Sequence, residues 1–370
     1  MNKILLCGNG INIEFNKEFC FKNFIDILTN EEKLLELINE ILEKLEYKEF
    51  DSFKEDFLEI FDKCKSSIIN LDQESKFNGV EIAVSAFKRS VKALIFQSPL
   101  NIKNENLNKF EHFFDLLFFY FLANLQKKSK INLLKNSKWN INFKKYLKEK
   151  EYQYIYTLNY DSLLTTIYKE SYIWHVHGKL KFENNKLDYK GCVFESYLNP
   201  KWNSLRKTTL PIFLDMNELK GEYNLDVVGL NSKNDEEIFI FFIFSQICKT
   251  ITYYFHNEND LKNFHEFLEM IANWNEESEG IELIKEKDFL KINLNEDYPD
   301  YNKKIEITED QAKLNYNIKF LERTNPSSEN WKIVHKLKIK LRESKDFWDE
   351  VNKKEIILID NKEELQNEKG

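Results

Sequence analysis

Two short polar motifs hold the residue types that could do chemistry in this chain. Asn159 and Asp161 lie one residue apart in YTLNYDSLL, and His175 and His177 have the same spacing in WHVHGKL. In an extended strand, residues two apart point to the same side. A carboxamide beside a carboxylate could bind sugar hydroxyls, an amide or a water, and a neutral imidazole accepts a proton near neutral pH.

Glycine marks the places where these motifs would meet a ligand. The chain has nine glycines. Four of them, Gly8, Gly10, Gly178 and Gly229, directly follow runs that predict strands. In open α/β folds, ligands bind at the carboxyl ends of the strands, where glycine lets the backbone approach a phosphate. The sequence therefore predicts a phosphate-binding edge at the carboxyl ends of these strands.

Each motif also has a purely structural explanation. The first glycine turn lacks the third glycine of a dinucleotide fingerprint, because Ile13 stands there, so a plain tight turn is an equal alternative. Asn159 or Asp161 would cap the helix expected after them. His177 would be a partly buried, hydrogen-bonded histidine.

A fourth motif, LDVVGLNSKNDEEIF, follows a later predicted strand. Gly229 ends that strand, and Asn231 and Ser232 lie in the polar loop after it. The loop could contact the ribose or phosphate of a nucleotide. Asp235, where a helix is expected to begin, is most simply an N-cap.

The elements that must position these motifs alternate between strand and helix. Apolar and β-branched runs predict strands at residues 3–7, 152–161, 171–178, 224–230 and 249–257. Residues 23–150 carry apolar side chains three and four apart, which predicts helices. The fold class is therefore α/β: a Rossmann-like parallel sheet with a large helical insertion after the first strand and a mixed C-terminal extension. We expect the Rossmann-like domain over 1–22 and 151–279, the insertion over 23–150 and an extension of unknown role over 280–370.

Composition narrows the classes of partner. The formal net charge of −8, with Lys and Glu interspersed, argues against direct nucleic-acid binding. Five scattered cysteines without a CxxC pair predict no metal site and suit a reducing cytoplasm. No signal peptide is recognised, and polar residues interrupt the apolar stretches 110–125 and 238–255. We expect a cytoplasmic protein without membrane contact.

The ordered set GNG, NYD, HG and G-x-x-S-x-x-D resembles the sirtuin-like NAD-binding superfamily. It is most similar to the bacterial defence-associated branches, which include AbiH-type abortive-infection proteins and a related uncharacterised family. The resemblance covers roughly residues 1–275. It implies a phosphate turn at Gly8, Asn9 and Gly10, a nicotinamide-ribose pair at Asn159 and Asp161, a catalytic His177 before Gly178, and an adenosine-end turn at Gly229 and Ser232.

Departures from the deacylating sirtuins direct the functional prediction. The zinc-binding cysteine module is absent, and Ile11, Asn12 and Ile13 replace the small and polar residues after the first glycine turn. The resemblance thus implies an NAD hydrolase, with NAD as substrate and nicotinamide and ADP-ribose as products. It further implies a regulated effector of anti-phage abortive infection, controlled by homo-oligomerisation, a regulatory protein or a nucleotide signal. The alternative is a catalytically inert module that senses NAD or ADP-ribose and controls a partner protein.

Overall fold

The computed structural model divides into two compact units. It describes residues 1–45, 52–63, 91, 93, 104–134, 138–168, 173–183, 186–189, 192, 221–232, 235, 238–239, 242, 248–273, 281–285 and 337–352. One unit, called the sheet unit below, comprises Met1–Leu6, Lys148–Ile155 and Asn217–Gly370. The other, called the helical unit, comprises Cys7–Leu147 and Tyr156–Met216.

A seven-stranded sheet organises the chain, with the strand order β3-β2-β1-β6-β7-β9-β8. Its strands are β1 (Asn2–Cys7), β2 (Tyr154–Thr157), β3 (Ile173–His175), β6 (Tyr223–Val228), β7 (Cys248–Phe255), β8 (Ile281–Lys285) and β9 (Leu337–Glu343). β6 pairs with β7, β7 with β9 and β8 with β9, all in parallel. The order changes direction between β1 and β6, as in doubly wound folds. The predicted Rossmann-like α/β class is confirmed.

The first two strands also run in parallel, although residues 8–153 separate them in sequence. The Gln153 N–H donates to the Lys3 carbonyl oxygen at 2.9 Å, and the Leu158 N–H donates to the Cys7 carbonyl oxygen at 2.9 Å. The apolar run of β1 predicts a strand buried on both faces, and its last four residues are indeed buried. The carboxyl ends of β1 and β2 are therefore fixed side by side.

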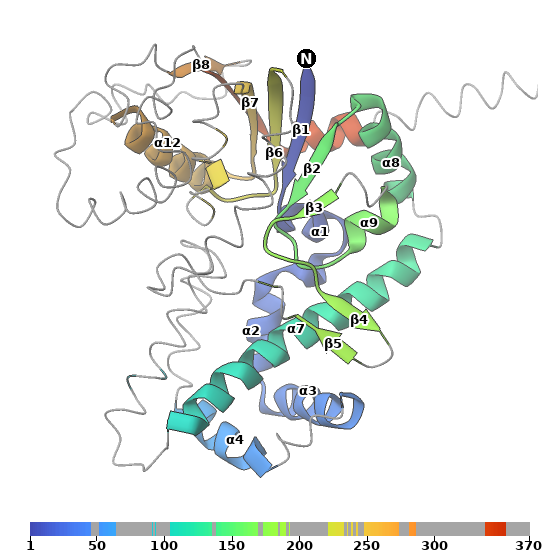
Figure 1. Cartoon of the computed structure of the whole chain (residues 1–370), viewed down its shortest axis with the longest axis vertical. Helices are drawn as coiled ribbons and strands as arrows, with labels where there is room; N and C mark the ends of the chain where they lie inside the picture. Colours follow the sequence, from blue (N-terminus) through green and yellow to red (C-terminus); the bar gives the residue numbers. More distant parts are fainter. Residues whose placement is uncertain are drawn as a thin grey trace, which may run out of the picture. The chain divides into compact units, whose positions relative to one another are not determined.

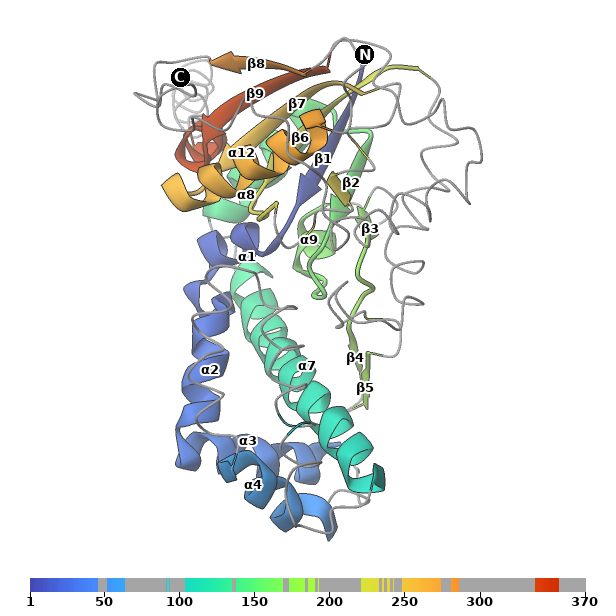
Figure 2. The ribbon, with the colours of Figure 1, turned by 90° about the vertical axis from the view of Figure 1, so that its left-hand side faces the viewer.

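The sheet unit buries one face of β7 against helix α12 (Glu258–Asn273). The Tyr253 and Phe264 rings stack with their centroids 3.9 Å apart, and Phe239 packs on both. Figure 2 shows α12 lying across β7. The next residue of β7, Tyr254, faces the opposite side because strand side chains alternate, and there it lies opposite Arg342 of β9.

The helical unit confirms that residues 23–150 are helical where the structure describes them (Figure 1). The helices that the structure describes between residues 9 and 150 are α1 (Asn9–Phe15), η1 (Lys17–Phe19), α2 (Phe21–Thr29), α3 (Glu31–Lys44), α4 (Lys54–Lys63), α7 (Asn104–Leu134) and α8 (Lys138–Lys150). Aromatic side chains fill the space between α2 and α7: the Phe24 ring lies 5.2 Å from the Phe118 ring and 5.4 Å from the Phe121 ring. The phenylalanines of the apolar stretch 110–125 therefore pack in the core of this unit.

Two segments contain strands beyond those that the sequence predicts. The stretch after Gly178 contains a two-stranded antiparallel hairpin, β4 (Lys181–Glu183) and β5 (Lys186–Asp188). The described parts of 280–370 include β8 and β9, which join the main sheet next to β7. The mixed C-terminal extension thus contributes strands to the central sheet. The predicted domain boundaries stay a prediction, since the two compact units divide the chain at other positions.

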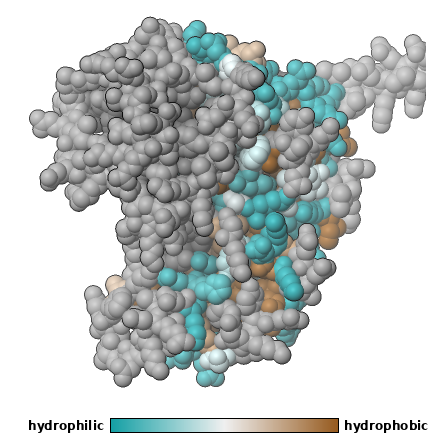
Figure 3. Space-filling model, in the orientation of Figure 1, coloured by the Kyte–Doolittle hydropathy of each residue, from teal (hydrophilic) through white to brown (hydrophobic). Residues whose placement is uncertain are grey.

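The described surface is polar overall. Figure 3 shows hydrophilic residues interspersed with smaller hydrophobic areas on the face drawn there. Among the described side chains, the exposed large hydrophobic residues are Met1, Ile131 and Ile141. Within the part of the chain that the structure describes, no helix is both long and apolar enough to cross a bilayer.

Candidate functional site

Strand β1 passes into helix α1 with Gly8 as the single residue between them. Gly8 is the N-cap residue of α1, with extended dihedral angles of φ −121° and ψ −163°. Its carbonyl oxygen accepts the Ile11 N–H at 3.2 Å. Gly10 is already helical, and the exposed Asn9 donates its carboxamide to the Phe19 carbonyl oxygen at 2.9 Å. The GNG motif is therefore a strand-to-helix junction.

Asn159 connects the ends of three strands. Its carboxamide Nδ2 donates to the Gly8 carbonyl oxygen at 3.2 Å, and its backbone N–H donates to Thr157 Oγ1 at 3.2 Å. Its own carbonyl oxygen lies 2.9 Å from Nδ1 of His175, the last residue of β3. Asn159 is buried. The side chain predicted to face a ligand is therefore bonded to the β1–α1 junction, and the backbone of the same residue contacts the ends of β2 and β3.

The contact with Asn159 fixes the proton on the His175 ring. A carbonyl oxygen is an acceptor, so Nδ1 must donate, and in the neutral ring the lone pair is on Nε2. His175 is half-buried. Sequence reasoning noted this histidine but gave the chemical role to His177.

Asp161 is engaged through both carboxylate oxygens. Oδ1 accepts the Leu163 N–H at 2.9 Å, at the start of helix α9 (Leu163–Ile167), and Oδ2 accepts a hydrogen bond from Asn12 Nδ2 of α1. The residue is only 4% exposed. Burial raises the pKa of Asp161, and the Leu163 N–H, His175 and Asn12 oppose that shift. The capping alternative thus accounts for one oxygen of Asp161, and a contact that the sequence did not predict accounts for the other.

His177 lies in a turn, beyond the end of β3. The strand ends at His175, and the Gly178 N–H donates to the His175 carbonyl oxygen at 3.2 Å. Gly178 has φ +87°, the left-handed conformation that favours glycine. The expectation that His175 and His177 project from one face of a continuing strand is therefore wrong. Position 178 requires glycine for this turn, whatever the role of the histidine before it.

Helix α7 of the helical insertion contacts His177 indirectly, through the Tyr160 ring. The half-buried His177 ring lies 6.0 Å from the Tyr160 ring. The Tyr160 ring in turn packs edge-on against Phe119 of α7, with centroids 5.4 Å apart. A second contact from α7 is polar: Gln126 Oε1 accepts the Ser162 N–H at 2.8 Å. Helix α7 therefore fixes the segment that carries Asn159 and Asp161.

The predicted adenosine-end residues lie in the sheet unit, after β6. Gly229 has φ +69° and allows the chain to turn there. Ser232 is fully buried, and its hydroxyl has no hydrogen-bond partner in the described part of the chain. The Asp235 carbonyl oxygen accepts the Ile238 N–H at 3.0 Å, as expected where a helical turn begins.

The helical unit brings together most of the predicted site residues and adds others. Gly8, Asn159 and Asp161 form one buried polar cluster, and His177 and Gly178 occupy the turn after β3. The residues that sequence reasoning missed are Asn12, Gln126, Tyr160 and the structural role of His175. Asn12 offered a signal, because it is polar and follows the buried Ile11 in the first turn of α1.

Within the described residues, no group of three or more His, Cys, Asp or Glu side chains is arranged to hold a metal ion. The side chains of the cluster offer carboxamide, carboxylate and imidazole groups. Comparisons of the chain with protein-family models, with curated proteins and with solved structures found no match.

Proposed function

We propose that this chain binds NAD as a substrate and hydrolyses it to nicotinamide and ADP-ribose. The observation that carries the proposal is the buried cluster at the carboxyl ends of β1, β2 and β3. There the Asn159 carboxamide, the Asp161 carboxylate and the His175 ring lie at the edge where open α/β folds bind ligands, and His177 follows in the turn after β3. The motif order described above supplies the identity of the nucleotide.

The reaction demands little acid catalysis from the protein. Nicotinamide is already cationic in NAD, so it leaves without being protonated. Positive charge then develops on the ribose, as in other glycosyl cleavages with an oxocarbenium-like transition state. Water adds to the anomeric carbon and loses one proton. The protein must hold the ribose, stabilise the charge and accept that proton.

In this proposal His177 accepts the proton from the water or from a ribose hydroxyl. The turn at Gly178 ends the strand and leaves the His177 ring half-buried on Tyr160, where a neutral imidazole can serve as a base. Asn159 orients the water. We assign Asp161 a positioning role, because both of its oxygens are already engaged by Leu163 and Asn12.

The remaining assignments rest on the resemblance. Gly8, Asn9 and Gly10 are proposed to lie along the NAD phosphates, and Gly229 and Ser232 to serve the adenosine end. The resemblance also suggests a regulated effector of anti-phage abortive infection, controlled by self-association, a regulatory protein or a nucleotide signal.

The test is nicotinamide release by the full chain, compared with His177→Ala and the matched control His112→Ala. His112 contacts Tyr189 on the surface and lies outside the cluster. We expect turnover to fall at least a hundredfold in the first variant and to persist in the second. Cellular NAD during phage infection supplies the same comparison if the purified enzyme needs a trigger. Equal turnover in the wild type and His177→Ala would overturn the assignment.

The sensor alternative accounts for the same contacts. Asn159 and Asp161 both make hydrogen bonds with internal partners, which is compatible with a binding fold as well as with a catalyst. Two measurements separate the functions: calorimetry of NAD or ADP-ribose binding to the purified chain, and nicotinamide release in infected and uninfected cells. Binding without release in either kind of cell would favour the sensor. Absence of both binding and release would contradict both functions.

A further inference from the structure

A tyrosine and an aspartate in the sheet unit make more hydrogen bonds than their ordinary protonation allows. Tyr253 Oη lies 2.9 Å from the carbonyl oxygen of Leu230, in the loop after β6. The same Oη lies 2.7 Å from Asp260 Oδ1, in the first turn of α12. All three groups are buried.

Counting protons exposes the conflict. A carbonyl oxygen only accepts, so the contact with Leu230 uses the single hydroxyl proton of Tyr253. An ionised carboxylate is also acceptor-only, which leaves no proton for the contact with Asp260. Both bonds form together if Asp260 Oδ1 carries a proton and donates it to Tyr253 Oη. The second oxygen, Oδ2, remains an acceptor for the His256 N–H at 2.9 Å.

We propose that Asp260 is protonated in the folded protein at neutral pH, and that the neutral Tyr253–Asp260 pair anchors the Gly229–Ser232 loop through Leu230. The hydrogen-bond chain runs from Asp260 through Tyr253 to the Leu230 carbonyl. It joins α12 and β7 to the loop that follows β6.

Burial favours this protonation. It raises the pKa of Asp260, whereas the hydrogen bonds from the His256 N–H and Tyr253 and the charge of His256 act in the opposite direction. Burial also raises the pKa of Tyr253, and the charge of Asp235 adds to this shift. The titratable groups that face the pair are Asp235, from the segment after β6, and His256, from the turn before α12.

The pair makes the loop sensitive to alkaline pH. When Asp260 loses its proton, the carboxylate competes for the single Tyr253 proton, and a hydrogen bond to an ionised acceptor is the stronger one. The Leu230 contact then weakens and the loop loosens. Any effect of the loosened loop on NAD binding rests on the proposed function, whereas the protonation and the anchoring do not.

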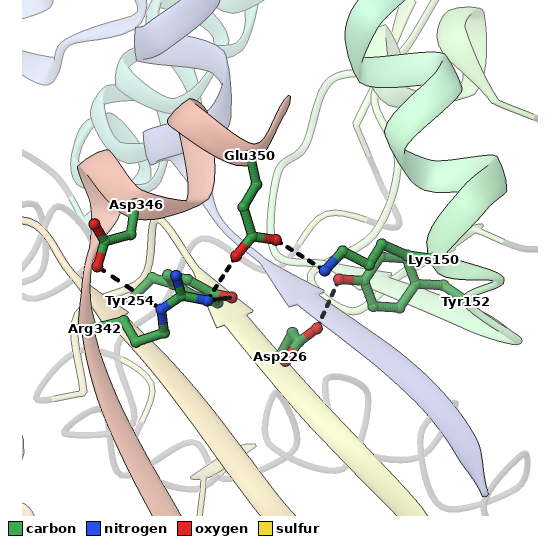
Figure 4. A network of polar contacts seen from close by, with 7 residues as sticks. All are labelled: Lys150, Tyr152, Asp226, Tyr254, Arg342, Asp346 and Glu350. Carbon is green, nitrogen blue, oxygen red and sulfur yellow. Dashed lines mark hydrogen bonds and ion pairs between the residues drawn. The ribbon is translucent and has the colours of Figure 1, made fainter. Parts of the chain in front are cut away.

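The protonation is tested by infrared spectroscopy of the full chain, because a protonated carboxyl group absorbs apart from a carboxylate. The variant is Asp260→Asn, whose amide can donate to Tyr253 and accept from His256 as the protonated acid does. The matched control is Asp226→Asn, since Asp226 accepts from Tyr152 at 2.7 Å and that contact needs only the tyrosine proton (Figure 4). We expect the wild-type minus variant spectrum at pH 7 to contain a protonated-carboxyl band for Asp260→Asn and a carboxylate band for Asp226→Asn. A carboxylate band for Asp260→Asn would overturn the proposal.

The anchoring is tested by hydrogen exchange at the amides of Leu230, Asn231 and Ser232. We expect Tyr253→Phe to speed their exchange at least tenfold, and the control Tyr254→Phe, on the opposite face of β7, to leave it unchanged. Unchanged exchange in Tyr253→Phe would overturn the anchoring. Neither measurement uses NAD, so failure of the proposed function can be told apart from failure of this inference. If only the proposed function is wrong, NAD turnover is absent while the infrared and hydrogen-exchange results are as expected.

Discussion

The Asn159 carboxamide donates a hydrogen bond to the Gly8 carbonyl oxygen at 3.2 Å, so a residue just beyond β2 holds the junction between β1 and α1. The bond joins positions 151 residues apart in the sequence. It makes the same side chain a candidate for ligand binding and a structural tie. Changes at Asn159 therefore affect stability and activity together, and the two must be measured separately.

Asn159→Ala is expected to lower the free energy of unfolding by about 1 kcal/mol, the usual net contribution of one buried hydrogen bond. The loss stays moderate because the Ile11 N–H still reaches the Gly8 carbonyl oxygen. Urea unfolding followed by circular dichroism measures it. The control is Asn23→Ala, which removes an exposed hydrogen bond to the Lys17 carbonyl oxygen. An equal loss of unfolding free energy in both variants would mean that the buried hydrogen bond to Gly8 stabilises the fold no more than an exposed one.

The stability conferred by Asp161 is expected to decline as the pH rises. Its pKa is raised in the folded state, chiefly by burial, so the folded chain binds the proton more tightly than the unfolded chain. The favourable contribution is full below the unfolded pKa and is lost as the pH rises through the folded value. Asp161→Asn removes this titration, and Asn12 can turn its amide to accept from the new side chain. Wild type minus variant unfolding free energies, measured from pH 4 to 8, should therefore fall, whereas a rise would contradict the burial argument.

Glu350 is expected to show the opposite pH dependence. Burial alone would raise its pKa, but hydrogen bonds from Lys150 at 2.8 Å and Arg342 at 2.7 Å outweigh that effect and lower it (Figure 4). The stabilisation is thus present above the unfolded pKa and lost as the pH falls through the folded value. Glu350→Gln should cost about 1 kcal/mol at pH 7 and less at high salt, since the group is partly exposed.

The exposed Lys44–Glu40 pair provides the control for that experiment. Glu40→Gln should change the unfolding free energy by about 0.5 kcal/mol or less. A cost for Glu350→Gln that persists undiminished at pH 3 would show that packing, and not the ion pairs, holds this side chain.

Cys7 is expected to resist thiol reagents in the folded protein. Burial raises its pKa to about 12, and its Sγ donates to the Tyr156 carbonyl oxygen at 3.5 Å. At pH 8 about one thiol in ten thousand would then be ionised, and the thiolate is the reactive form. The half-buried Cys20 should react before Cys7. Peptide mapping after iodoacetamide treatment, with and without urea, measures the order, and early labelling of Cys7 would contradict it.

Local sequence patterns predicted the helices and strands, but they did not predict the contacts between residues far apart in the sequence. The apolar run of β1 and the helical spacing in α12 are visible in the sequence because they reflect burial on defined faces. The end of β3 is not visible, since alternation continues through WHVH while the backbone turns after His175. The Asn12–Asp161 bond joins residues from α1 and the segment after β2, which no local spacing relates. The NYD motif correctly drew attention to Asp161, and its partner had to come from the fold.

The adjacency of β1 and β2 has a consequence for how the helical insertion could vary. The chain leaves the sheet after Cys7 and returns at Gln153, and hydrogen bonds to Lys3 and Cys7 set the register of the two strands. The intervening residues act as one long closed loop, whose closure entropy grows only slowly with its length. Segments at the far end of the loop, such as α4, could therefore be shortened or exchanged without shifting the strand pairing. Helix α7, whose Gln126 reaches Ser162, marks the part that must stay.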